Sequence, residues 1–324
     1  MKKVTLKDIA KELNVTVGTV SHVFNGRDDI SEETRAKVLE TANRMGYISN
    51  NAAASLRLGK TKTVAIIVPD ISNPHIAHQI KLIEDRISAL DYSVIILNTN
   101  ESDKAEYKAI VTACGRQVDG ILLCPSQHST ENIEFLNKME IPYLLIGRSF
   151  DELDADYVHA DDKKGGYLAG KYLVSRGCKN PLFVGAYSRI TASVNRLEGV
   201  KKAFAEKGIE VHSVETSPKC DDAEGLLKEA LTDGEFYDSI IAFSDLLAFK
   251  IISLVDKSVR VVGFDAVNRH LYMPFPYVSV GMVGNGWADK AVDILMEKIN
   301  GSREKYRELI DVELFRFNKS THKK

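Results

Sequence analysis

Hydrophobic and polar positions divide the chain into two unlike parts. In the first part, residues 5–46, hydrophobic residues recur at helical spacing, i, i+3, i+4 and i+7, beginning with Leu6, Ile9, Ala10 and Leu13. From Thr63 onward, short continuous apolar runs alternate with amphipathic segments of helical length. The pattern therefore predicts a small helical unit followed by a larger α/β unit.

Three short helices are predicted within residues 5–46. Thr16 precedes the second helix and Ser31 the third, and both side chains are favoured N-terminal caps. Gly46 is placed to end the third helix. The residues expected to face inward from the second and third helices are Val20, Val23, Phe24, Val38, Leu39, Ala42 and Met45.

The α/β unit contains two series of predicted strands that divide near Ala160. The first series reads "TVAIIVP", "YSVIILNT", "DGILLCP" and "PYLLIG", and the second reads "PLFVGA", "SIIAFS", "RVVGFD" and "YVSVGM". Continuous apolar strands separated by helices indicate parallel sheets that are covered on both faces. We therefore expect two similar lobes with a cleft between them, and ligands of such sheets bind at the carboxyl ends of the strands.

Composition adds a charge asymmetry to this picture. The formal net charge is −2, yet residues 1–60 carry ten Lys and Arg against seven Asp and Glu, so the helical part is basic and the rest acidic. A basic head favours a polyanionic partner. No apolar run is long enough to span a membrane, and the first residues lack the apolar core of a signal peptide. The four cysteines are scattered, which is typical of reduced thiols, and we expect a cytoplasmic protein.

The helical part has the organisation of a helix-turn-helix. Its first two helices are joined through "NVT", and the second projects Val17, Gly18, Ser21, His22 and Asn25 outward. A structural helical bundle without a DNA-binding role is the alternative.

Longer stretches of sequence carry a specific resemblance. "VTLKDIAKELNVTVGTVSHVFNG" and "ISEETRAKVLETANRMGY" resemble the DNA-binding head of the lactose-repressor/galactose-repressor family of bacterial transcription regulators. The similarity continues in the family's order through "NNAAASLRLGKT", "DISNPHIAHQI", "GGYLAGKYLVSRG", "NRLEGVKKAF" and "VVGFD". The resemblance implies an α/β protein with a three-helix helix-turn-helix head, a hinge helix and a two-lobed, periplasmic-binding-protein-like core. The implied boundaries are a head at 1–48, a hinge at 49–61 and a core at 62–324, in which lobe 1 takes about 62–160 plus 286–312 and lobe 2 about 161–285 plus 313–324.

The resemblance also implies which residues contact DNA. The base-reading positions correspond to Val17, Gly18 and His22, and the phosphate-contacting positions to Thr16, Ser21, Asn25, Ser31, Thr34 and Tyr47. Position 22 is most often arginine in the family, and histidine offers fewer donors to a guanine, so few bases should be read directly. The minor-groove hinge positions correspond to Asn50, Ala53, Leu56 and Arg57, with Leu56 as the apolar wedge that kinks the duplex. Ordinary linker packing is the alternative role for Leu56.

Seven residues of the core match effector-binding positions of the family: Arg196, Asp265, Asp245, Asn73, His75, Ile76 and Arg148. Arg196 and Asp265 suit a small polar effector, such as a sugar, because charge-assisted hydrogen bonds are strong in a closed cleft. A surface ion pair is the alternative for these two, and a cap of the following helix is the alternative for Asp245.

We therefore expect a homodimeric transcription regulator, most simply a repressor of a carbohydrate-related operon, that binds a palindromic double-stranded operator. A corepressor-dependent or protein-partner-dependent regulator is the alternative, and a solute-binding protein or α/β enzyme is a more distant one. "GNGWAD" imitates a dinucleotide fingerprint but lies near the end of the chain, and His75 and His78 lack an evident third ligand. We expect no enzymatic activity, no cofactor, no metal and no membrane partner.

Overall fold

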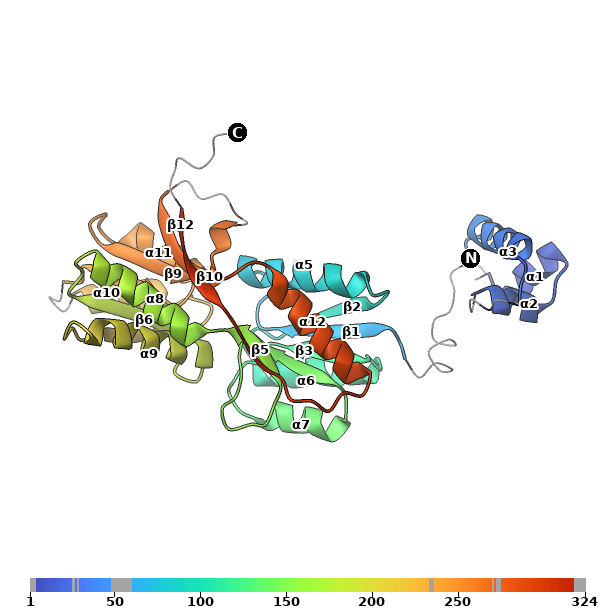
Figure 1. Ribbon diagram of the computed structural model, residues 1–324, viewed down its shortest axis with the longest axis horizontal. Helices are drawn as coiled ribbons and strands as arrows, with labels where there is room; N and C mark the ends of the chain where they lie inside the picture. The colour runs from blue at the N-terminus through green and yellow to red at the C-terminus, as the bar shows by residue number, and fades with distance from the viewer. Residues whose placement is uncertain are drawn as a thin grey trace. The chain divides into compact units, whose positions relative to one another are not determined.

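The structure, a computed structural model, describes residues 4–24, 27, 29–47, 60–232, 236–269, 271 and 275–317. The chain divides into two compact units, an N-terminal unit at 1–61 and a C-terminal unit at 62–324 (Figure 1).

The N-terminal unit contains three helices around a small apolar core. They are α1 (Leu6–Leu13), α2 (Val17–Phe24) and α3 (Glu32–Met45). The core is made of Ile9, Ala10, Val20, Val23, Val38 and Ala42. This arrangement confirms the three helices expected from the hydrophobic pattern.

The ends of these helices are set by the predicted residues. The Thr19 N–H donates to Thr16 Oγ1 at 3.0 Å, and the Thr34 N–H donates to Ser31 Oγ at 3.3 Å. Gly46 ends α3 with a left-handed φ of 68°. The expectation that Leu39 faces inward is wrong, because its side chain is 47% exposed. One residue after the buried Val38, it is turned about 100° away from the core.

The first lobe of the C-terminal unit is a parallel six-stranded sheet in the order β11-β5-β4-β3-β1-β2. Its strands are β1 (Thr63–Val68), β2 (Ser93–Asn98), β3 (Gly120–Leu123), β4 (Tyr143–Ile146), β5 (Tyr157–Ala160) and β11 (Arg307–Ile310). Its helices are α5 (Pro74–Ser88), α6 (Asp103–Gly115), α7 (Glu131–Met139) and α12 (Gly286–Ile299). Val64 and Ile66 of β1 pack with α5 and α12, while Ala65 and Ile67 pack with α6 and α7, so both faces of the sheet are covered.

The second lobe repeats this plan with the strand order β12-β10-β9-β8-β6-β7. Its strands are β6 (Pro181–Ala186), β7 (His212–Thr216), β8 (Ser239–Ala242), β9 (Arg260–Phe264), β10 (Tyr277–Met282) and β12 (Val312–Phe317). Its helices are α8 (Asp162–Ser175), α9 (Thr191–Ala205), α10 (Ala223–Thr232), α11 (Asp245–Leu254) and the short 3₁₀ helix η1 (Val267–Arg269). Helices α8 and α9 cover one face and α10 and α11 the other, and β12 runs antiparallel to β10.

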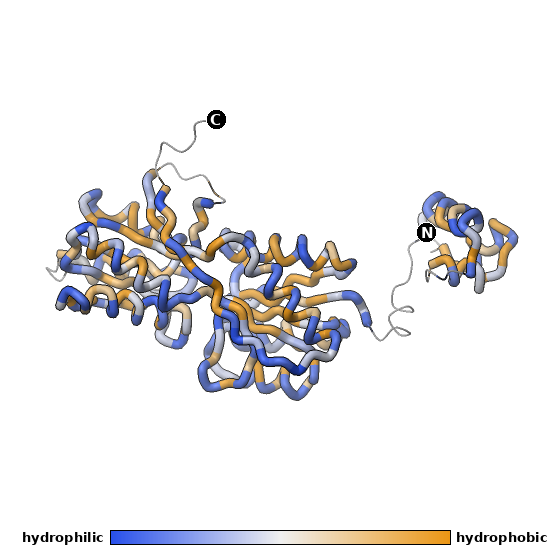
Figure 2. Tube along the Cα trace, in the orientation of Figure 1, coloured by the Kyte–Doolittle hydropathy of each residue, from blue (hydrophilic) through white to orange (hydrophobic). Residues whose placement is uncertain are grey.

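Within the described part of the chain, three segments connect the two lobes: 160–162, 282–286 and 310–312. All eight strands predicted from apolar runs are present, which confirms the expected α/β class. Figure 2 shows that hydrophobic residues concentrate in the strands and on the helix faces that cover them. None of the helices in the described ranges combines the length and hydrophobicity needed to cross a bilayer.

Candidate DNA-binding face and effector cleft

The predicted base-reading positions lie at the start and middle of α2. Val17 is 41% exposed and Gly18 is exposed, while Val20 and Val23 of the same helix are buried in the core of the N-terminal unit. The two residue sets therefore occupy different faces of α2. A small apolar side chain and a glycine on the outer face can contact a thymine methyl and admit close backbone approach, but they offer no side-chain hydrogen bonds.

His22 has a partner within the N-terminal unit. Its Nδ1 lies 3.2 Å from Asp29 Oδ2, and the side chains are 37% and 55% exposed. When Nδ1–H donates to this carboxylate, only Nε2 remains to face another group. The pairing is a contact that the sequence pattern did not reveal.

The predicted phosphate contacts that the structure describes lie at or near helix ends, except for Ser21, which lies within α2. The Thr16 and Ser31 hydroxyls cap α2 and α3, Thr34 Oγ1 lies 2.9 Å from Ser31 Oγ, and Ser21 is half-buried on α2. The Tyr47 ring packs on Phe24 with centroids 5.1 Å apart. Asn25 and the hinge residues Asn50, Ala53, Leu56 and Arg57 lie outside the described residues.

A cavity of about 140 Å³ lies between the two lobes, at the carboxyl ends of their strands. Six of the seven predicted effector residues line it: Asn73, His75, Ile76, Arg148, Arg196 and Asp265. They come from both lobes, so a ligand in the cavity would contact both.

Arg196 of α9 is held by the second lobe itself. Its Nε donates to Asp162 Oδ1 at 2.7 Å, its Nη1 donates to the Phe243 carbonyl oxygen, and Nη1 lies 3.6 Å from Asp265 Oδ1. The guanidinium lies 4.6 Å from the centroid of the Phe264 ring. Burial tends to lower the pKa of Arg196, but the neighbouring carboxylates raise it above the usual value, so the side chain stays charged.

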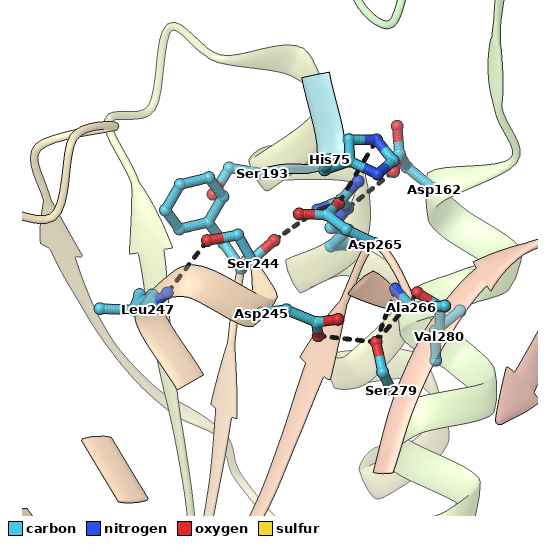
Figure 3. Close-up of polar contacts among 12 residues, drawn as sticks. His75, Asp162, Ser193, Ser244, Asp245, Leu247, Asp265, Ala266, Ser279 and Val280 are labelled. Atoms are coloured by element: carbon cyan, nitrogen blue, oxygen red, sulfur yellow. Dashed lines mark hydrogen bonds and ion pairs between the residues drawn. The ribbon is translucent and has the colours of Figure 1, made fainter. Parts of the chain in front are cut away.

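Asp265 follows β9 in a backbone conformation unusual for this residue type. Its φ is 99° and that of Ala266 is 49°, both in the left-handed half of conformational space. Non-glycine residues adopt such angles only when their surroundings enforce them. Across the cleft, His75 Nε2 of α5 lies 4.0 Å from Asp265 Oδ1, so the two lobes approach each other at this point (Figure 3).

Asp245 lies below the cavity rather than on its wall. It is fully buried, its Oδ1 accepts hydrogen bonds from the hydroxyls of Tyr277 and Ser279, and its Oδ2 accepts from the Val267 N–H at 2.7 Å. Ser279 Oγ also accepts from the Ala266 N–H at 3.0 Å, as Figure 3 shows. Asp245 therefore supports the turn that carries Asp265. It does not cap α11 either, because Ser244 does so by accepting from the Leu247 N–H at 3.3 Å.

The first-lobe residues differ in what they can offer a ligand. Arg148 makes a two-pronged ion pair with Glu101, with Nη1–Oε2 and Nη2–Oε1 distances of 2.8 and 2.6 Å. The Asn73 side chain caps α5 by accepting from the His75 N–H at 2.9 Å. Ile76 contributes apolar surface to the wall. His75 Nε2 also lies 2.7 Å from Gln79 Nε2.

Several lining residues were missed in the sequence. Glu101 follows β2, Asp162 follows β5 and Ser244 follows β8, so the rule that ligands bind at the carboxyl ends of strands could have found all three. The aromatic rings of Phe243, Phe264 and Trp287 also line the cavity. Rings with a few polar groups among them are typical of small-molecule sites.

Three further observations bear on the chemistry of this region. "GNGWAD" connects β10 of the second lobe to α12 of the first, so it does not form the βαβ unit of a dinucleotide site. Burial raises the pKa of Cys124, on the cavity wall, to about 11, so its thiol is protonated near neutral pH. No group of three or more potential metal ligands occurs in the described ranges.

Comparison with known proteins accounts for both units. Residues 5–50 match the sequence model of bacterial regulatory proteins of the lacI family. Residues 61–283 match the model of periplasmic binding proteins and the sugar binding domain of the LacI family.

Individual relatives extend over most of the chain. The HTH-type transcriptional regulator DegA of Bacillus subtilis (strain 168) is 32% identical over 275 residues, which cover 81% of this chain and 82% of the relative. The ribose operon repressor of Haemophilus influenzae (strain ATCC 51907 / DSM 11121 / KW20 / Rd) is 27% identical over 317 residues, covering 94% and 95%. The lac repressor dimer bound to operator and the anti-inducer ONPF has the same fold, with a TM-score of 0.84 at 20% identity and coverage of 97% and 98%. The chain is therefore a member of the LacI family of bacterial regulatory proteins, a DNA-binding transcription regulator with a small-molecule effector domain.

Proposed function

We propose that this regulator represses a carbohydrate-related operon and that a small polar, sugar-like effector in the inter-lobe cleft controls its operator affinity. The observation that carries the proposal is the position of Arg196 and Asp265. They stand 3.6 Å apart on the wall of a cavity that His75 lines from the other lobe. A guanidinium and a carboxylate side by side can donate to one hydroxyl of a sugar and accept from the next.

The proposed control is a thermodynamic linkage between the cleft and the DNA. A ligand that contacts both lobes favours one angle between them, and that angle sets how the two hinges of a homodimer are spaced. At only one spacing would both hinges insert into the minor groove of a palindromic operator. The hinge residues that would do so are Asn50, Ala53, Leu56 and Arg57. By reciprocity, operator DNA changes effector affinity by the same factor as effector changes operator affinity.

Direct base reading would be sparse. Val17, Gly18 and His22 offer few hydrogen bonds to bases. DNA deformation at the hinge would therefore supply much of the selectivity. Phosphate contacts would hold the protein in register on the DNA, from Thr16, Ser21, Asn25, Ser31, Thr34 and Tyr47. The site serves binding rather than catalysis, and we place the protein in the cytoplasm, where its DNA lies.

The test begins with the purified full chain and fragments of its source genome. Bound fragments are sequenced to define the operator, and compounds processed by the neighbouring genes are then tested for an effect on operator binding. Arg196→Ala and Asp265→Ala should each lose the ligand response and keep operator binding, since each truncation leaves polar groups unpaired at a cost of about 1–3 kcal/mol. Lys228→Ala, which breaks an exposed helix pair with Glu224, is the control and should keep both.

The sign of the effect separates the two regulatory schemes. Release from the operator by the ligand supports an inducible repressor, and tightened operator binding supports a corepressor scheme. A normal ligand response in both Arg196→Ala and Asp265→Ala would show that these residues do not read the effector. Absence of any small-molecule effect on DNA binding would favour control by a protein partner.

A further inference from the structure

The arginines of the cleft have carboxylate partners from the protein itself. Arg148 and Glu101 form a two-pronged pair whose side chains are only 11% and 10% exposed. Arg148 Nη1 also donates to the Pro125 carbonyl oxygen at 2.9 Å. Burial tends to lower the pKa of Arg148, but hydrogen bonding to Glu101 raises it above the usual value, so the guanidinium stays charged. The two guanidinium nitrogens that would bind a phosphate are therefore already hydrogen-bonded to Glu101.

Arg196 is compensated in the same way on the second lobe. Its Nε bonds to Asp162 at 2.7 Å, and the side chains are 13% and 4% exposed. Asp265 lies 3.6 Å from Nη1 on the other side. One cation is therefore flanked by two carboxylates, and this leaves a local excess of negative charge.

The remaining charges on the cavity wall increase that excess. Five carboxylates line the cavity: Asp70, Glu101, Asp161, Asp162 and Asp265. The fixed cations among the described lining residues are the two arginines and Lys219, whose side chain is exposed. A phosphate would therefore enter beside uncompensated like charge, and both guanidiniums that could bind it already pair with carboxylates of the protein. A hydroxyl or an ammonium group meets no such repulsion.

We propose that the cleft selects polyhydroxylated ligands that are neutral or carry an amine, that it rejects their phosphate esters, and that Glu101 and Asp162 determine this specificity. The inference rests on the proposed effector role of the cleft and assigns the charge class of the effector.

The first arm of the test does not require the natural effector. The probe is inorganic phosphate, and the thermal midpoint of the full chain is compared in phosphate and in chloride at equal ionic strength. The wild-type protein should show no phosphate-specific shift. Glu101→Gln and Asp162→Asn should each show an upward shift, because each variant releases an arginine to bind the anion.

Asp156→Asn is the matched control. Asp156 forms a buried ion pair with Lys298, with 7% and 18% of the side chains exposed, and it does not line the cavity. The control should be destabilised to a similar degree without gaining a phosphate-specific shift. Two independent variants keep the test decisive if one of them does not fold.

The second arm compares matched ligands by calorimetry: D-ribose with ribose 5-phosphate, D-glucose with glucose 6-phosphate, and D-glucosamine with glucosamine 6-phosphate. Any of the uncharged or amino sugars that binds should bind the wild type at least about tenfold more tightly than its phosphate ester. Tighter binding of a phosphate ester, a phosphate-specific shift in the wild type, or no gain in both Glu101→Gln and Asp162→Asn overturns the inference. A phosphate ester that binds and alters operator affinity would refute this charge assignment while leaving the proposed regulatory function intact.

Discussion

Gly166 of α8 lies directly against the backbone carbonyl oxygen of Arg196 on α9. A Cβ atom at position 166 would stand 1.9 Å from that oxygen, and one at Gly199 would stand 2.0 Å from the Lys163 carbonyl oxygen. The two helices therefore cross at a distance that only glycine permits. Because Asp162 begins α8 and Arg196 lies on α9, this crossing sets the 2.7 Å contact between the two side chains on the cleft wall.

Gly166→Ala should accordingly affect the cleft as well as the fold. The added methyl group has to separate α8 from α9, and overpacking of this kind costs about 1–3 kcal/mol of unfolding free energy. The Arg196–Asp162 contact should lengthen, and effector affinity should fall. Denaturant unfolding and effector titration measure the two effects.

Gly225→Ala provides the control for that experiment. Gly225 lies in α10, and a Cβ there meets no atom within 4 Å. Alanine should be neutral or slightly stabilising at this position, since it is the better helix former by about 1 kcal/mol. Equal stability and equal effector affinity of Gly166→Ala and wild type would contradict the role assigned to the crossing.

Gln127 joins the two lobes on one side of the cleft. Its Nε2 donates to the Ser149 carbonyl oxygen at 2.6 Å and to Thr191 Oγ1 at 3.1 Å, and its Oε1 accepts from the Thr191 N–H at 3.2 Å. Thr191 is the first residue of α9, the helix that carries Arg196. These bonds should favour the approach of the lobes seen in the structure.

Gln127→Ala should therefore weaken effector binding about five- to tenfold, since a lost hydrogen bond is worth roughly 1–1.5 kcal/mol. Small-angle scattering of the ligand-free variant should show a larger radius of gyration than that of the wild type. Thr130→Ala is a suitable control, because the Thr130 hydroxyl donates to Glu134 within the first lobe. Unchanged affinity and unchanged scattering in Gln127→Ala would show that the lobes are held together by other contacts.

The architecture was largely predictable from the hydrophobic pattern, but four of the strands were not. The predicted strands are mostly continuous apolar runs buried in the sheets. The missed strands β7, β11 and β12 lie at sheet edges and carry exposed residues, and only the two middle residues of the four-residue strand β5 are buried. Their pairing depends on neighbours far away in the chain, which local periodicity does not report.

The residues of the cleft were also only partly predictable from the sequence. Residue type and resemblance singled out Arg196 and Asp265, and the structure places both on the cavity wall. That Arg148 pairs with Glu101, 47 residues away, follows only from the strand order β4-β3-β1-β2, which brings the segments after β4 and β2 to the same edge of the sheet. The burial of Asp245 beneath the cavity is likewise a property of the fold rather than of its local sequence.

Asp245 should make the stability of the chain depend on pH. Burial, together with the charge of Asp265, raises the pKa of Asp245 above the usual carboxyl value. Because the pKa is higher in the folded state than in the unfolded state, the folded protein binds the proton more tightly. This contribution to the unfolding free energy is complete below the unfolded-state pKa of about 3.9, and it is lost as the pH rises through the folded-state pKa. The unfolding free energy of the wild type should therefore decrease relative to that of Asp245→Asn from about pH 4 upward. Denaturant titrations of both proteins across this range test the sign, and parallel curves would contradict it.

The pairing of His22 with Asp29 leads to a prediction about base preference. With Nδ1 3.2 Å from the carboxylate, His22 has one nitrogen left to meet a base, so His22→Ala should change operator affinity by less than about tenfold. His22→Arg should instead introduce a preference for guanine at one position in each half-site, because a guanidinium can bond both O6 and N7. Asp29→Asn is the companion variant: it removes the charge beside position 22 and should leave the base preference of the His22 protein nearly unchanged. Selection of binding sites from random DNA with the four proteins measures all of these effects, and identical preferences for wild type and His22→Arg would show that position 22 does not face the bases.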